Sequence, residues 1–98
     1  MIDSPIVSGD DPLERCRSEI ERIDRAMVTL LAERVLAGTL IASAKVERAL
    51  PILDPAQEAR VVSRAAEWAR AVGLPDEEVR ELFWRIIAIT RRAEDASR

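Results

Sequence analysis

The first half of the chain places apolar and small residues at steps of three and four, the spacing that gathers side chains on one face of an α-helix. A single charged residue, Arg34, interrupts this apolar stripe. Asp11-Pro12-Leu13-Glu14 supplies an N-cap, a proline at the first helical position and a capping-box glutamate. No proline follows before Pro51, so we expect one helix of about 38 residues, from Asp11 to Ala49. The stripe consists of Leu13, Cys16, Ile20, Ile23, Met27, Leu30, Ala37, Ile41 and Ala44.

A helix of this length cannot be covered by its own chain. It would extend for about 57 Å, whereas a compact chain of 98 residues has a radius of gyration of about 13 Å. We therefore expect a second copy to bury the stripe in an intertwined, obligate homodimer. A free-standing parallel coiled coil is the alternative, but Arg34 in the seam and Gly38 one turn later suit a lined cavity better than a zipper.

A second, shorter helix is predicted from Asp54 to about Val72. Asp54-Pro55 repeats the pattern of cap and proline, and Gly73 follows as a C-terminal stop. The face of this helix that we expect to be buried consists of Val61, Val62, Ala65, Trp68, Ala69 and Val72.

A third helix is predicted from Pro75 onward, with acids in its first turn and with Arg91 and Arg92 balancing its far end. The expected class is thus all-α, with three helices in one domain over residues 11–98, after a flexible tail over residues 1–10. The apolar series of the third helix is Val79, Leu82, Phe83, Ile86 and Ile87, and it continues into Thr90, Ala93 and Glu94.

The composition of the chain limits its possible partners and the catalytic groups it can use. The net charge is −3 and the arginines alternate with acids, so no nucleic-acid partner is indicated. The N-terminus lacks a basic, apolar leader and we find no apolar run of membrane-spanning length, which predicts a cytoplasmic protein without a membrane partner. Cys16, the only cysteine, is expected in the core. Histidine and tyrosine are absent, which removes the usual general base and the imidazole metal ligands, so we expect chemistry that depends on positioning and electrostatics.

Two cations share a face of the first helix. Arg34 and Lys45 are 11 residues apart, which places them within about 20° of one face and roughly 16 Å apart along the axis. The small floor of Gly38, Ile41 and Ala42 lies between them, so the pair would form a slot for a compact dianion. Lys45 is also the only lysine among 15 basic residues, which suggests a place for a compact ammonium.

Three further charged residues bear on this slot. Arg17 lies about 25 Å from Arg34 along the helix and points about 100° away, so it could join the slot only from a partner chain. Glu58 is either a favourable charge near a helix N-terminus or a side chain pointing into the slot. Glu94 either belongs to a solvated C-terminus or continues the apolar face of the third helix.

Taken together, these segments resemble the all-helical class of chorismate mutases. The resemblance covers roughly residues 13–94 and includes LERCRSEIERIDRAMVTLLAERVLAGTLIASAK, the ILDPAQE turn and GLPDEEVRELFWRII. It implies a three-helix chain that dimerises through its long first helices, with two active sites that each borrow one arginine from the other chain. It further implies rearrangement of chorismate to prephenate, in aromatic amino acid biosynthesis by the shikimate pathway, and a reaction that needs no metal or other cofactor.

The resemblance also implies catalytic roles for individual residues. Arg34 looks like the clamp on a substrate carboxylate, and Arg17 like the arginine donated by the partner. Lys45 resembles the lysine that bonds the ether oxygen, and Thr90 takes the place of a serine that helps to hold a carboxylate. Glu94 stands where several relatives carry a glutamine that donates to the ether oxygen, so this role requires a protonated Glu94.

The substrate-binding set is completed by groups on the connection and the second helix. Asp54, through its backbone N–H, and Glu58, through its side chain, resemble the groups around the ring C4 hydroxyl. Ile41 and Ile87 are the apolar members of the expected set. A departure from the family pattern is Gln57, where some relatives carry arginine.

Other functions stay open at this stage. 4-Amino-4-deoxychorismate mutase and isochorismate pyruvate-lyase use related helical scaffolds. The chain could also be a dimerisation or regulatory module, although retention of Arg17, Arg34 and Lys45 argues against a pure scaffold. A partner enzyme of the same pathway is not readable from the sequence.

Overall fold

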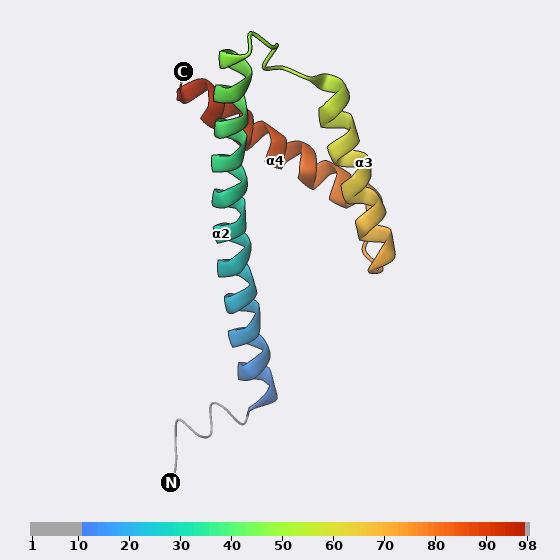
Figure 1. The fold of residues 1–98 in the computed structure, drawn as a ribbon. Coiled ribbons are helices and arrows are strands. Elements are labelled where there is room, and N and C mark those ends of the chain that lie inside the picture. Colours follow the sequence, from blue (N-terminus) through green and yellow to red (C-terminus); the bar gives the residue numbers. More distant parts are fainter. Residues whose placement is uncertain (1–10, 98) are drawn as a thin grey trace. The chain divides into compact units, whose positions relative to one another are not determined.

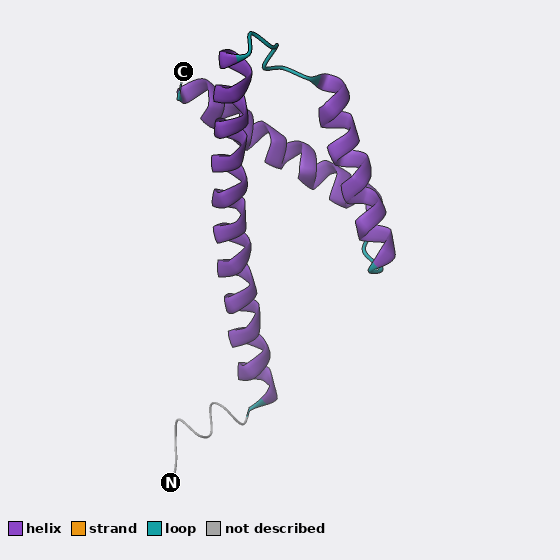
Figure 2. Cartoon of the chain, in the orientation of Figure 1, coloured by secondary structure: helices purple, strands orange, loops and turns teal. Residues whose placement is uncertain are grey.

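The computed structural model describes residues 11–97, and the predicted tail over residues 1–10 lies outside them. Three helices follow one another in the described part: α2 (Pro12–Glu47), α3 (Pro55–Ala71) and α4 (Asp76–Ala96) (Figure 1). Within this range no segment forms a strand, as Figure 2 shows. The predicted all-α class and the long N-terminal helix are confirmed.

The ends of α2 follow local chemistry. At its start, the Asp11 side chain accepts a hydrogen bond from the Leu13 N–H at 3.1 Å, as expected of an N-cap. At its end, Ala49 adopts a left-handed conformation with a φ of 57°, and the Leu50 N–H donates to the Lys45 carbonyl at 2.8 Å. This turn ends the helix at Glu47, slightly before the predicted boundary at Ala49.

The described part of the chain divides into two units, residues 11–32 and residues 33–97. The described part of the first unit contains a single helical segment, which has no second element of its own unit to pack against. Its apolar residues are accordingly exposed in this chain, and so is Cys16, contrary to the prediction that it is a core residue. These exposed apolar residues include Leu13, Ile20, Ile23, Met27 and Leu30.

The second unit holds the core, which forms where α3 packs against α4. On α3 this core uses small residues, and Ala66 is fully buried although the predicted face omitted it. Trp68 and Val72 were predicted to be buried but are 59% and 72% exposed. The narrow alanine face lets α4 approach closely, whereas the Trp68 ring lies at its flank beneath the Arg64 guanidinium, 5.2 Å away. The buried residues of this unit are Ala42, Val62, Ala65, Ala66, Ala69, Ile87 and Thr90.

The turn between α3 and α4 contains the predicted glycine stop. Gly73 has a φ of 79°, and the Leu74 N–H donates to the Ala69 carbonyl at 2.8 Å. Across this turn Arg70 donates to Asp76 at 2.7 Å, which lowers the pKa of the Asp76 carboxyl below its ordinary value. This bond connects the end of α3 to the first residue of α4.

The far end of α4 differs from the prediction. The helix continues to Ala96, so its last turn contains no basic residue. Arg91 and Arg92 lie before that last turn and do not balance the helix end. Leu82, a member of the predicted apolar series, is 51% exposed, whereas Ile87 is buried.

One helix, α2, is long and apolar enough to cross a membrane by length and composition alone. This finding corrects our expectation that no such run exists. It is weak evidence of a membrane segment, because helices that form the core of soluble proteins pass the same test. The cytoplasmic location and the lack of a membrane partner stay predictions.

We predict that Ala66→Leu destabilises the protein by about 1–3 kcal/mol, because the larger side chain cannot enter the contact between α3 and α4 without displacing a helix. Ala59→Leu is the matched control, since Ala59 is exposed on the same helix and alanine and leucine have similar helix propensities. Chemical denaturation at one fixed protein concentration measures the difference. Equal stability of the two variants would contradict the packing described here.

Candidate active site

A pocket of roughly 300 Å³ opens within the second unit, between the C-terminal part of α2, the following connection, α3 and α4. Its volume is at the lower end of the range for small-molecule sites. Of the nine residues that the sequence nominated, Arg17 belongs to the first unit, where its guanidinium lies 3.5 Å from the Glu14 carboxylate. The other eight all line this pocket: Arg34, Ile41, Lys45, Asp54, Glu58, Ile87, Thr90 and Glu94.

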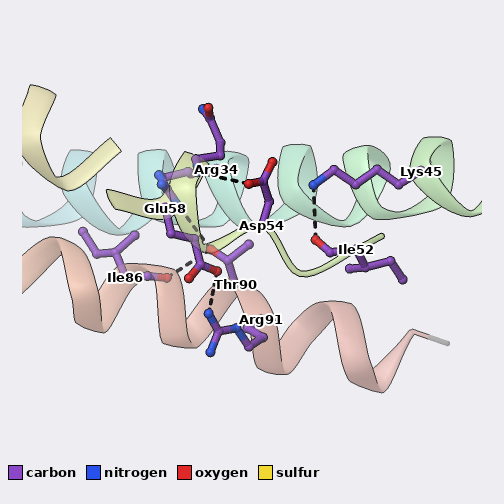
Figure 3. A network of polar contacts seen from close by, with 9 residues as sticks. Arg34, Lys45, Ile52, Asp54, Glu58, Ile86, Thr90 and Arg91 are labelled. Atoms are coloured by element: carbon purple, nitrogen blue, oxygen red, sulfur yellow. Dashed lines mark hydrogen bonds and ion pairs between the residues drawn. The ribbon is translucent and has the colours of Figure 1, made fainter. Parts of the chain in front are cut away.

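Arg34 is held at the pocket by a neutral partner. Its Nη1 donates to the hydroxyl of Thr90 at 3.1 Å, and that hydroxyl donates in turn to the Ile86 carbonyl at 3.0 Å (Figure 3). Thr90 is buried. Because its single O–H donor is used by the carbonyl, the Thr90 oxygen presents lone pairs to Arg34 and fixes the guanidinium without neutralising it.

Lys45 is held in a similar manner. Its Nζ donates to the backbone carbonyl of Ile52 at 3.2 Å, across the connection that leads from α2 to α3 (Figure 3). Among residues 11–97, neither Lys45 nor Arg34 forms an ion pair. The pocket therefore contains two positive charges that the described residues leave without an anionic partner, which favours an anionic ligand.

Gly38 forms part of the pocket floor, as the sequence predicted. A Cβ atom added there would overlap Thr90 Cγ2 and would lie 3.2 Å from Glu94 Oε2. The missing side chain thus lets α4 bring Thr90 and Glu94 over α2. Glu94 is half-buried and lines the pocket, which agrees with its predicted place on the same helix face as Ile87 and Thr90.

Asp54 has a structural role that is visible in this chain. Its side chain accepts from the Gln57 N–H at 3.2 Å and caps the start of α3. Gln57 also lines the pocket, and its side-chain oxygen accepts from Arg60 Nε at 3.0 Å. These contacts place the start of α3 beside the pocket.

Arg91 is a pocket residue that sequence reasoning missed. It crosses from α4 to the Glu58 carboxylate on α3, with Nη2 2.5 Å from Oε2 (Figure 3). This hydrogen bond and the charge of Glu58 raise the pKa of the Arg91 guanidinium above its ordinary value. The spacing contained a signal, since Arg91 is four residues after Ile87 and three before Glu94 and so shares their helix face.

Comparisons with known proteins identify the family of this chain. The sequence model of the family described as chorismate mutase type II matches residues 16–95. A 4-amino-4-deoxychorismate mutase from Streptomyces venezuelae is 30% identical over 91% of this chain and 86% of that protein.

Two longer relatives come from Enterobacter agglomerans. A T-protein is 26% identical over 85% of this chain, and a bifunctional chorismate mutase/prephenate dehydratase is 32% identical over 83%. The matched region makes up only 22% and 21% of those two proteins. Since the family match spans most of the three-helix chain, the resemblance found in the sequence is confirmed, and the protein belongs to the chorismate mutase type II family of isomerases.

Proposed function

We propose that this protein rearranges chorismate to prephenate. The observation that carries the proposal is the pair of cations, Arg34 and Lys45, which line one small pocket and have no anionic partner among the described residues. Chorismate is a compact dianion, so its charges would be complementary to this pair.

The proposed reaction suits a site of this kind. It is an intramolecular [3,3] rearrangement in which one C–O bond breaks and one C–C bond forms, so the reaction requires no external nucleophile, metal or cofactor. The protein would hold the flexible substrate in a folded, near-attack conformation and stabilise the negative charge that develops on the ether oxygen.

The hydrogen-bonding capacity of both cations supports these roles. An ammonium has three N–H donors, and Lys45 uses one of them on the Ile52 carbonyl. A guanidinium has five, and Arg34 uses one of them on Thr90. In the proposal Arg34 clamps a carboxylate, while Lys45 donates to the ether oxygen.

The remaining pocket residues have supporting roles in the proposal. Glu94, in its protonated form, faces the ether oxygen together with Lys45. The backbone N–H of Asp54 and the side chain of Glu58 surround the ring hydroxyl. Ile41 and Ile87 provide apolar contact with the substrate.

A second candidate reaction is the rearrangement of 4-amino-4-deoxychorismate. It is favoured by the relative from Streptomyces venezuelae, which carries that name and matches most of this chain. The two reactions share a mechanism and differ in one ring substituent. Chromatography of the products formed from each substrate distinguishes them, and isochorismate tests the lyase alternative in the same assay.

The proposal includes a homodimer with shared active sites. The apolar stripe on the first part of α2 is exposed in the single chain, and its burial would drive association. Arg17 lies on the same part of α2. In the dimer, Arg17 of each chain would complete the site of its partner.

The first test of the function is Lys45→Ala. We expect kcat for loss of chorismate, followed by ultraviolet absorbance, to fall by about 10²–10³-fold, because a donor to the developing oxyanion is removed. Arg48→Ala is the control, since it removes a cation near the end of the same helix but outside the residues that line the pocket. Full activity in Lys45→Ala would refute the proposed mechanism.

Glu94 predicts a pH dependence. An ionised carboxylate repels the ether oxygen, whereas the amide of Glu94→Gln donates to it at any pH, so the variant should have a flatter pH–rate profile than the wild type. Glu81→Gln, an exposed glutamate on the same helix, serves as control. A pH–rate profile unchanged in Glu94→Gln would remove Glu94 from the mechanism.

The shared site predicts complementation. Arg17→Ala and Arg34→Ala should each be inactive alone, but mixed and refolded together they should regain activity, because a mixed dimer contains one site with both arginines. Refolding each variant by itself is the control. A mixture that stays inactive, or a wild-type protein that elutes as a monomer at micromolar concentration, would contradict the shared site.

A further inference from the structure

The three cations that line the pocket are not equivalent. Arg34 and Lys45 are bonded to a hydroxyl and a backbone carbonyl, which leave their charges unneutralised. Arg91 is paired with the carboxylate of Glu58, and this is the one ion pair between pocket-lining residues in the described part of the chain. In the described part of the chain, the pocket lining therefore contains two cations outside any ion pair, one cation whose charge is balanced by Glu58, and two further carboxylates, those of Asp54 and Glu94.

We propose that Arg91 is a positioning residue that makes the site select a neutral hydroxyl over an ammonium on the ring of its substrate. It would do so through Glu58, whose charge it balances and whose carboxylate it orients. The proposal rests on the proposed function, because it assumes a chorismate-like dianion in the pocket. It concerns only the substituent that distinguishes chorismate from 4-amino-4-deoxychorismate.

The pocket offers few acceptors for the single neutral donor of such a ligand. Asp54 caps α3 by accepting from the Gln57 N–H through Oδ1, and in the proposed function it contributes its backbone N–H, which is a donor. The Thr90 oxygen accepts from Arg34. Glu94 lies over Gly38, and in the proposed function it acts as a donor. Glu58 is thus the carboxylate suited to receive the ring substituent.

The contact between Arg91 and Glu58 leaves this acceptor usable. The bond reaches Oε2, and among residues 11–97 the Glu58 side chain has no other hydrogen bond, so Oε1 keeps its lone pairs for a ligand. The Glu58 side chain is 22% exposed and that of Arg91 is 47% exposed, so the pair lies at the pocket edge, where a ligand can reach it.

Charge then decides between the two substituents. A hydroxyl needs only a lone pair, which the paired carboxylate supplies. An ammonium would gain little from a carboxylate whose charge is already balanced, and the nearby guanidinium would repel it. Without Arg91, the same carboxylate would carry an uncompensated negative charge and would favour the ammonium.

The test compares Arg91→Met with Glu58→Gln. In each variant, kcat/KM for chorismate is divided by the corresponding value for 4-amino-4-deoxychorismate. Where the amino compound is not converted, the reciprocal of its inhibition constant (1/Ki) replaces its kcat/KM. We expect this preference for chorismate to fall about tenfold in Arg91→Met, a change equivalent to about 1.4 kcal/mol. It should rise in Glu58→Gln, because an unpaired Arg91 then repels the ammonium.

The preference for chorismate is expected to change in opposite directions in the two variants, and this distinguishes a role in specificity from a purely structural role. Loss of a simple link between α3 and α4 would change both variants in the same direction, which would overturn the proposal. Arg92→Met removes a neighbouring cation outside the pocket-lining residues and should leave the ratio unchanged. Should Arg91→Met fail to fold, the rise expected in Glu58→Gln still decides the question.

The same experiment distinguishes failure of the role of Arg91 from failure of the proposed function. If chorismate is turned over but the ratio does not move, the role of Arg91 fails and the proposed function stands. If neither compound is turned over, the proposed function fails, and calorimetric dissociation constants for the same two compounds provide the ratio instead. Binding of neither compound, or a wild-type preference for the ammonium, overturns the inference.

Discussion

The hydrogen bond from Arg34 to the buried hydroxyl of Thr90 joins α2 to α4 without cancelling a charge. The positive charge that Arg34 presents to the pocket depends on this neutral partner. A carboxylate at position 90 would hold the guanidinium at least as firmly, but it would neutralise the charge. A hydroxyl that already donates to the Ile86 carbonyl fixes the arginine in place and leaves its charge for a ligand.

Close approach of the two helices is the geometric counterpart of this bond. Gly38 has no side chain, and a Cβ there would overlap the Thr90 methyl group. Gly38 and the hydrogen bond between Arg34 and Thr90 therefore depend on each other, because the Thr90 hydroxyl can reach Arg34 only when α4 lies directly over Gly38. The fully buried Ala66 indicates a similar use of small residues where α3 packs against α4. Small side chains thus place the elements that carry the polar ones.

Much of this arrangement is readable from local sequence patterns. Proline, cap and glycine signals located the three helices to within a few residues, and helical spacing placed Arg34 and Lys45 on either side of Gly38. Contacts between helices were harder to predict. Trp68 was assigned to the core from its place on the apolar face of the helix, although the contact with α4 buries valine and alanine residues instead, and Arg91 was assigned to a helix end. Neither error could be avoided from periodicity alone, because spacing defines a face but not the neighbour that the face meets.

The charges of Arg34 and Lys45, which have no anionic partner among the described residues, have a consequence for the protein in solution. Charges that the polypeptide does not balance are balanced by mobile anions from the buffer, which a dianionic ligand must displace when it enters. Apparent affinity for the ligand should thus weaken as ionic strength rises, and multivalent buffer anions such as phosphate or sulfate should compete for the same place. Release of these anions to the solvent would then supply part of the free energy of binding. The affinity measured for a ligand at this site should therefore depend on the buffer.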